Sequence, residues 1–177
     1  MRISSSNHLV AKYGAELLEN FKTEASLYFH WPFCKNICTF CSFNKYKKSE
    51  SKFGLDFENL MEVALLKETQ TVLEITGVKQ IKSIYFGGGT PSLLPTKTIS
   101  NLINGVKQLT EVVEDIEITI ECNPSSLDIT TTLKEYLQSG ISRVSLGVQV
   151  NLKLFISNLT MEVIINVFIN RVFVTTH

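Results

Sequence analysis

The chain has 177 residues, and its 17 basic residues balance its 17 acidic residues. Apolar residues make up 44% and charged residues 19%, which excludes a disordered chain and predicts about one globular domain. No global basic field exists, so we expect no nucleic-acid partner. The apolar runs are shorter than the ~20 residues that a membrane span needs, and four cysteines are too few for a disulfide framework.

The N-terminal segment has the composition of a targeting sequence. Its first fifteen residues, MRISSSNHLVAKYGA, contain no acid, are rich in serine and carry Arg2 and Lys12. This composition is typical of a mitochondrial presequence, and a frayed terminus fits it equally well. We therefore expect residues 1–25 to be an N-terminal arm or a targeting segment.

The first two predicted elements are a short strand and a long helix. SLYFH (26–30) is typical of a strand and is followed by Pro32. A helix is expected from about Asp56 to Ile75, with Asp56 as its N-cap and Gly77 as its stop. Helical spacing predicts a core face made of Phe57, Leu60, Met61, Ala64, Leu65, Val72 and Ile75.

Strands and helices then alternate. IKSIYF (81–86) is the second strand and leads into the loop GGGTPS, and IEITIEC (116–122) and RVSLGVQ (143–149) are the third and fourth strands. This order predicts an α/β fold with parallel strands and right-handed crossovers. The helices between these strands are Ile99–Leu109 and the segment SSLDITTTLKEYLQSG, with Asp128 as N-cap and Gly140 as stop.

Strand alternation gathers polar side chains at one edge of the predicted sheet. In the third strand, Cys122 shares a face with three isoleucines, and we expect that face to meet the helices as part of the core. Glu121 then lies on the other face, as do Tyr28, His30 and Gln149. All four polar residues end their strands on the carboxyl side, where barrels and open α/β sheets place their sites. We predict that they converge on a functional site.

The last 28 residues have a different character. Residues 150–177 are rich in Asn, Ile, Val and Phe and contain no Gly or Pro. Their β-branched content favours a strand, but the pattern assigns no definite element. Unless this segment pairs with it, the fourth strand is expected to present an unpaired edge.

Three cysteines crowd one short loop. Cys34, Cys38 and Cys41 have the spacing Cys-x3-Cys-x2-Cys. A disulfide leaves an odd thiol, a loop containing Lys35 suits a purely packed core poorly, and a zinc site needs a fourth ligand, for which only His30 is close. An iron–sulfur cluster fits better because thiolates are its usual ligands. Three ligands on a four-iron cluster leave one iron open, which indicates chemistry with a bound small molecule.

At these residues the chain resembles the radical S-adenosylmethionine (SAM) superfamily, whose signature is CxxxCxxC. LYFHWPFCKNICTFCSFNKY, IYFGGGTPSLL, IECNP and RVSLGVQ together resemble its coproporphyrinogen dehydrogenase-like branch, over residues 26–149. Oxygen-independent coproporphyrinogen III oxidases of that branch carry a further cysteine where this chain has Phe43. In this respect the chain is similar to the HemW heme chaperones and their mitochondrial counterparts.

The resemblance implies an incomplete domain. Family members form a partial (β/α) barrel of six units and add a C-terminal domain, and about four of the six βα units are present here. Residues 26–149 correspond to the N-terminal part of the radical SAM domain, and 150–177 to a divergent tail. After GVQ this chain reads VNLKLF and ends at His177, so we expect a truncated protein, and an active chain and one inactivated by truncation both remain open.

The resemblance also implies cofactors and their ligands. It predicts a 4Fe–4S cluster on the three cysteines, SAM chelated by the open iron, and an electron donor. Several candidate residues have an alternative role. Phe40 could only pack the loop, and the glycines could only form a tight turn. Tyr28 and His30 could be interior polar groups with satisfied hydrogen bonds. The implied SAM contacts are Tyr28 and Phe40 near the cluster, Gly88, Gly89 and Thr90 at the methionine end, Glu121 at the ribose hydroxyls, and Gln149.

The implied function is heme binding and transfer to acceptor proteins, in mitochondria or, alternatively, in the cytoplasm. Two other functions remain open from the sequence. One is an oxidoreductase of coproporphyrinogen, which Phe43 disfavours. The other is a zinc-binding interaction module.

Overall fold

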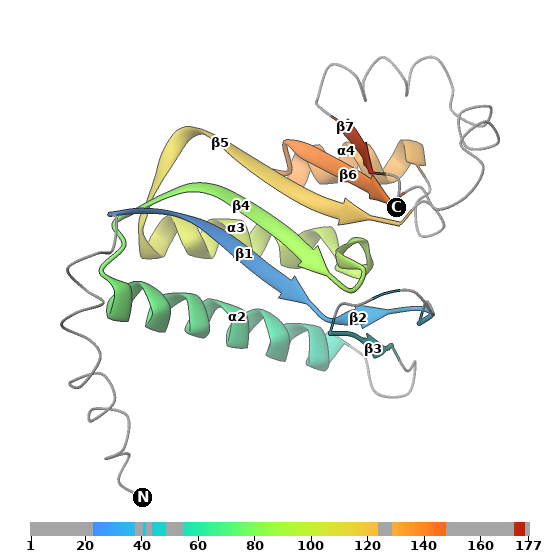
Figure 1. Ribbon diagram of the computed structural model, residues 1–177, viewed down its shortest axis with the longest axis horizontal. Coiled ribbons are helices and arrows are strands. Elements are labelled where there is room, and N and C mark those ends of the chain that lie inside the picture. The colour runs from blue at the N-terminus through green and yellow to red at the C-terminus, as the bar shows by residue number, and fades with distance from the viewer. Residues whose placement is uncertain are drawn as a thin grey trace, which may run out of the picture.

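The fold is a parallel sheet covered by helices on one face (Figure 1). In this computed structural model the described residues are 23–37, 41, 44–48, 55–123, 129–147 and 172–175. The main sheet contains, in spatial order, β1 (Glu24–Trp31), β4 (Gln80–Gly88), β5 (Glu111–Cys122), β6 (Arg143–Gly147) and β7 (Val172–Thr175), and a small sheet pairs β2 (Phe33–Cys34) with β3 (Tyr46–Lys47). The helices are α2 (Leu55–Thr76), α3 (Thr96–Leu109) and α4 (Ile129–Ser139), with a 3-10 turn, η1 (Pro91–Leu93).

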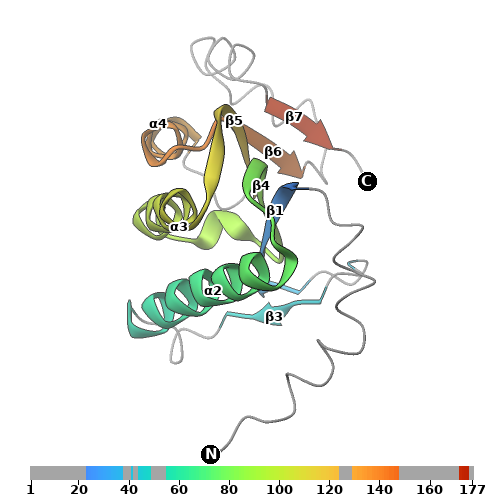
Figure 2. The same ribbon diagram turned by 90° about the vertical axis from the view of Figure 1, so that its left-hand side faces the viewer.

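All neighbouring strands of the main sheet run parallel. Figure 2 shows the three α-helices on the same side of the sheet, while the opposite side carries no described helix. The predicted α/β fold with parallel strands and intervening helices is therefore confirmed. None of these helices, in the parts of the chain described, is long and apolar enough to cross a membrane.

The core lies between the sheet and its helices. Alternate residues of the central strands, such as Phe86 in β4 and Ile120 in β5, are fully buried there, and so is Leu102 of α3. Each such side chain contributes about 1.5–3 kcal/mol through burial. The predicted core faces of the third and fourth strands are confirmed, because Ile118, Ile120, Cys122, Val144 and Leu146 all belong to this core.

The long helix packs through a narrower stripe than its spacing predicted. Phe57, Met61 and Leu65 contact the core as expected. Leu66 and Leu73 join them, because the helix is turned so that this stripe faces α3 and the sheet. The prediction was wrong for four of the seven residues, which are exposed: Leu60, Ala64, Val72 and Ile75.

The predicted glycine stop of the long helix is correct, whereas its predicted N-cap is wrong. Gly77 follows α2 with a φ of 70°, and its N–H donates to the Leu73 carbonyl over 2.9 Å, as a helix stop requires. Gly140 follows α4 with a φ of 98°. Asp56 lies in the first turn of α2 rather than before it, because the helix begins at Leu55. Asp128, the other predicted cap, lies outside the described residues.

The third strand begins earlier than alternation indicated. Ile81 pairs with Val112 and Ser83 with Glu117, so one residue of β4 lies opposite four residues of β5. This irregularity breaks the period-two pattern that identified the strand from residue 116 onward.

β6, the fourth strand predicted from the sequence, is paired at the edge that was expected to be open. β7 pairs with it in parallel, with Val144 opposite Val172 and Gly147 opposite Thr175. Part of the C-terminal segment therefore forms the strand that its β-branched residues favoured. The predicted boundaries at residues 25 and 149 stay predictions.

Substitution of one leucine in α3 and one in α2 tests which faces of these two helices are buried. Leu102→Ala empties a fully buried position and is expected to lower the free energy of unfolding by about 2–5 kcal/mol. Leu60 is 65% exposed, so Leu60→Ala is expected to change it by less than about 0.5 kcal/mol. Urea unfolding followed by circular dichroism measures both. Equal losses would contradict the orientation of α2.

Candidate functional site

The cysteine-bearing loop is closed at its base by backbone hydrogen bonds. The Tyr46 N–H donates to the Pro32 carbonyl over 2.7 Å, and the Lys48 N–H donates to the Cys34 carbonyl over 2.8 Å. These bonds join β2 to β3 and hold the two flanks of the loop together. The loop leaves the carboxyl end of β1 (Figure 1), where the predicted site was expected.

Two of the three cysteines of the CxxxCxxC motif, Cys34 and Cys41, lie in the described part of the loop. Cys34 is 7% exposed, Cys41 is half-buried, and both are free thiols. The Lys45 ammonium group donates to the Cys41 carbonyl over 2.5 Å and so braces the loop near the second thiol. Cys38, Phe40 and Phe43 lie outside the described residues, so the three-cysteine ligand set stays a prediction.

His30 is bonded to the loop through one ring nitrogen. Its Nε2 lies 3.1 Å from the Asn44 carbonyl oxygen, an arrangement in which the ring N–H donates. A Cβ on Gly88 would lie only 2.7 Å from the other ring nitrogen, Nδ1. Because one ring nitrogen is hydrogen-bonded to the loop and the ring packs against Gly88, this geometry favours a satisfied polar group over a zinc ligand.

The glycine loop lies directly against the chain that leads into Cys34. The Gly89 N–H donates to the Trp31 carbonyl over 2.6 Å, and the Thr90 N–H donates to the Phe33 carbonyl over 2.9 Å. A Cβ on Gly89 would lie 2.8 Å from the Pro32 carbonyl carbon and 2.9 Å from the Phe33 nitrogen.

Gly88 has a φ of +110°, which a residue with a side chain rarely adopts. The chain's own backbone therefore requires glycine at both positions. Their contact with SAM stays a prediction.

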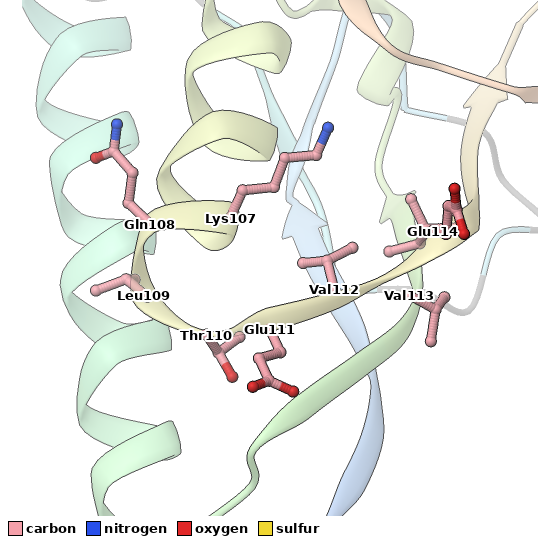
Figure 3. A pocket seen from close by; sticks show the side chains of 9 residues that line it. Lys107, Gln108, Leu109, Thr110, Glu111, Val112, Val113 and Glu114 are labelled. Carbon is pink, nitrogen blue, oxygen red and sulfur yellow. The ribbon is translucent and has the colours of Figure 1, made fainter.

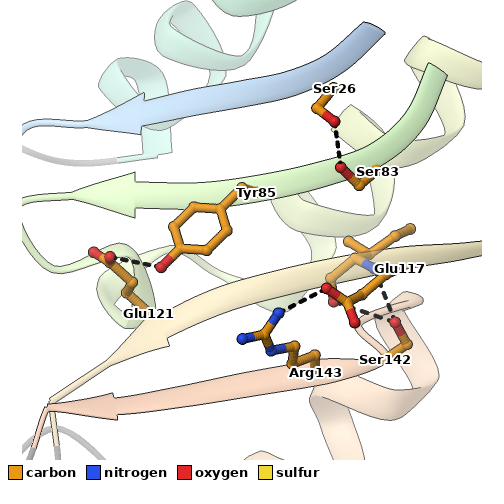
Figure 4. A network of polar contacts seen from close by, with 8 residues as sticks. Ser26, Ser83, Tyr85, Glu117, Glu121, Ser142 and Arg143 are labelled. Carbon is orange, nitrogen blue, oxygen red and sulfur yellow. Dashed lines mark hydrogen bonds and ion pairs between the residues drawn. The ribbon is translucent and has the colours of Figure 1, made fainter. Parts of the chain in front are cut away.

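Glu121 is held by two donors at the end of β5. The Tyr85 hydroxyl donates to Oε1 over 2.8 Å (Figure 4), and the Gly88 N–H donates to Oε2 over 3.3 Å. The partner that a half-buried carboxylate needs is thus supplied by two residues of β4.

Tyr28 lies on the same face of the sheet, close to this carboxylate. Its ring is 51% exposed and stacks on Tyr85, with ring centroids 5.8 Å apart and planes inclined by 16°. Partial burial, and next the charge of Glu121, raise the pKa of Tyr28. Burial and the bond to Glu121 raise the pKa of Tyr85 to about 12. Both phenols are therefore protonated donors at neutral pH.

Tyr85 is the residue that sequence reasoning missed. It lies two residues before Gly87 in IYFGGG, on the face that alternation assigned to Glu121, so the signal was present in the strand pattern. The structure brings Tyr28, His30 and Glu121 to one end of the sheet with Tyr85 among them. Gln149 lies outside the described residues.

Cys122 is a core residue, as its alternation predicted. It is 4% exposed and packs on the helix side of the sheet. Burial raises the pKa of its thiol to about 12, although the Tyr136 hydroxyl lies within hydrogen-bond reach. Cys122 is therefore separate from the cysteine loop in both position and chemistry.

A concave surface lies at the opposite end of β5 (Figure 3). It is lined by residues 107–114 and Ile116, at the junction of α3 and β5, and contains none of the predicted site residues. Its lining comes from one continuous stretch of chain, beside the pairing irregularity of β5.

Comparison with known proteins identifies the superfamily to which the chain belongs. The model of the radical SAM superfamily matches residues 28–153, and the chain belongs to this superfamily. The structure of coproporphyrinogen III oxidase (HemN) from Escherichia coli, described as a radical SAM enzyme, superposes with a TM-score of 0.64 and 27% identity, over 85% of this chain and 35% of that one. The predicted partial barrel of the radical SAM type is thereby confirmed.

Individual relatives show which members of the superfamily this chain is similar to. The chain is 38% identical to radical S-adenosyl methionine domain-containing protein 1, mitochondrial, of Bos taurus, over 71% of this chain and 27% of the relative. It is 40% identical to the heme chaperone HemW of Buchnera aphidicola subsp. Acyrthosiphon pisum, over 70% of this chain and 32% of the relative. The chain thus spans about a third or less of the length of these relatives.

The contact between the glycine loop and the cysteine loop is testable by thiol accessibility. Gly89→Ala places a Cβ against backbone atoms, so the loop must move and Cys34 should be alkylated faster by iodoacetamide. Gly77→Ala is the control for backbone strain alone, because its φ of 70° also disfavours a side chain but nothing lies within 4 Å of the added Cβ, so the Cys34 rate should not change. Mass spectrometry of metal-free protein measures the rates. An unchanged Cys34 rate in Gly89→Ala would contradict the contact.

The raised pKa of Cys122 predicts protection from alkylation. A pKa of about 12 rather than 9.0 lowers its thiolate fraction at neutral pH roughly a thousandfold, and burial blocks access. In native metal-free protein we expect iodoacetamide at about pH 8 to modify Cys41 and spare Cys122. Unfolding in guanidinium chloride should abolish the difference. Modification of both thiols at one rate would refute it.

Proposed function

We propose that this chain binds a 4Fe–4S cluster through Cys34, Cys38 and Cys41, binds SAM at the open iron, and takes part in heme handling as a HemW-like chaperone. The observation that carries the proposal is the position of the CxxxCxxC loop at the carboxyl ends of parallel strands. The chain that enters this loop, at Trp31 and Phe33, is hydrogen-bonded to the GGGT loop. Membership of the radical SAM superfamily supports the cluster and SAM.

The donor set fits such a cluster. Cys34 and Cys41 are free thiols on a loop whose flanks are held by backbone bonds, and Cys38 falls between them in the sequence. Thiolate sulfur is the usual ligand of iron in these clusters. When bound and reduced, the cluster supplies the electron that cleaves the sulfonium of SAM, which requires an electron donor as a partner.

The residues around Glu121 suit the nucleoside part of SAM. A carboxylate accepts hydrogen bonds at about four lone-pair positions, and Tyr85 and Gly88 fill two of them. The remaining positions suit the two vicinal hydroxyls of a ribose. In the proposed site Gly88, Gly89 and Thr90 contact the methionine end of SAM. Tyr28 and Phe40 line the site near the cluster, and Gln149 is a further contact by its position in the motif.

Heme is proposed from relatives and from one departure in the motif. HemW proteins of Buchnera aphidicola and Escherichia coli are named heme chaperones. Phe43 replaces the extra cysteine of the oxidases, which disfavours porphyrinogen oxidation. The partners would be heme and heme-acceptor proteins. The mitochondrial names of several relatives support a mitochondrial location.

An oxidoreductase of coproporphyrinogen is the second candidate, because the E. coli oxidase superposes on this chain. The two functions are separable by cluster removal. Turnover of a porphyrinogen depends on the cluster, so it should be lost with any one ligand cysteine. Heme binding that persists without the cluster would favour the chaperone.

Anaerobic reconstitution tests the cluster and SAM together. Wild-type protein should take up about four irons and four sulfides, and its electron paramagnetic resonance signal should change when SAM is added. Cys38→Ala is expected to lose the cluster, and Cys122→Ala, which removes a core thiol, should keep it. Full iron loading of Cys38→Ala would refute the ligand set. Stoichiometric zinc without sulfide would instead support a zinc module.

A further inference from the structure

A hydrogen bond between two strands ends on Glu121. Tyr85 of β4 donates from its hydroxyl to Glu121 Oε1 of β5 over 2.8 Å, and the Ser145 side chain of β6 lies within reach of the Tyr85 hydroxyl. Ser145 is itself buried. Figure 4 shows the Tyr85 ring reaching from β4 toward β5, with its hydroxyl at the carboxylate.

The two donors to Glu121 come from different parts of β4 and bind different oxygens. The Gly88 N–H is a backbone group whose place is fixed by the glycine loop, and it lies 3.3 Å from Oε2. The Tyr85 bond is shorter and comes from a side chain. Two anchors on two oxygens define the plane of the carboxylate, whereas one anchor leaves it free to rotate.

The Tyr85 ring is held in turn by its neighbours. It stacks on Tyr28, and a Cβ on Gly87 would lie 2.8 Å from the Tyr28 ring and 2.9 Å from the Tyr85 ring. The absence of a side chain at Gly87 therefore makes room for both rings. A phenylalanine at position 85 retains this packing and lacks only the donor.

A positive charge lies near the Tyr85 hydroxyl. The Arg143 guanidinium pairs with Glu117 over 2.8 Å, and its charge acts on Tyr85. Arg143 thus pairs with Glu117, whereas Tyr85 and Gly88 donate to Glu121.

We propose that Tyr85 is a positioning residue, which orients the Glu121 carboxylate so that its two remaining acceptor positions face the vicinal hydroxyls of a bound ribose. This inference rests on the proposed function, because it concerns the same SAM site. Tyr85 itself need not touch the ligand, since its hydroxyl proton is committed to Glu121. Its effect should therefore be confined to ligands that carry a ribose.

The test compares the binding of SAM with that of methionine to the anaerobically reconstituted 177-residue chain. Methionine offers the iron its amino and carboxylate groups and has no ribose. We expect Tyr85→Phe to weaken SAM binding about tenfold, because a misoriented Glu121 loses about one hydrogen bond to the ribose, and to leave the methionine affinity within about twofold. Dissociation constants come from titration of the cluster's electron paramagnetic resonance signal.

A double-mutant cycle separates positioning from direct contact. If Tyr85 acts through Glu121, Tyr85→Phe should add no further loss in a Glu121→Gln background. Ser83→Ala is the matched control. It removes a 2.7 Å hydroxyl bond to Ser26, from the same strand and face but nearer the amino end, and should leave SAM affinity unchanged.

Four outcomes would overturn the inference. They are unchanged SAM affinity in Tyr85→Phe, an equal loss for methionine, full additivity with Glu121→Gln, and an equal loss in Ser83→Ala. Each of these leaves the proposed function standing, because wild-type protein still binds SAM. A wild-type cluster whose signal does not respond to SAM would overturn both proposals together.

Discussion

The candidate site depends on the contact between the glycine loop and the strand that enters the cysteine loop. Two backbone hydrogen bonds, from Gly89 to Trp31 and from Thr90 to Phe33, place these segments side by side. A side chain at Gly89 would collide with the backbone of Pro32 and Phe33, so the contact requires glycine there. Because the contact is between main chains, it positions Cys34 at the carboxyl edge of the sheet whichever side chains surround it.

The sheet supplies the second requirement, a face on which polar groups can remain. All the described α-helices cover one face, which leaves Tyr28, Tyr85 and Glu121 on the other (Figure 2). On the covered face the same strands bury Phe86 and Ile120. One alternating pattern therefore builds the core and arranges the acceptor and donors of the site.

Family membership and geometry support one interpretation at different levels. The superfamily match establishes the class of protein, and relatives that are mitochondrial radical SAM proteins and heme chaperones establish the branch. Each match covers about a third or less of the relative. Heme transfer and its partners therefore rest on the proposal, whereas the cysteine loop and the Glu121 network are properties of this chain's own residues.

By itself, the sequence determined the parallel α/β order, the core faces of the strands and the residues gathered at their carboxyl ends, because period-two alternation is local. It did not determine which side of α2 is buried, because Leu60 and Leu65 both fit the spacing of a helical core face. Only the packing of α2 against the rest of the fold distinguishes them. It also left Tyr85 unrecognised and β7 unassigned. Those features depend on how separate strands come together, and only the tertiary structure brings a phenol of β4 to a carboxylate of β5.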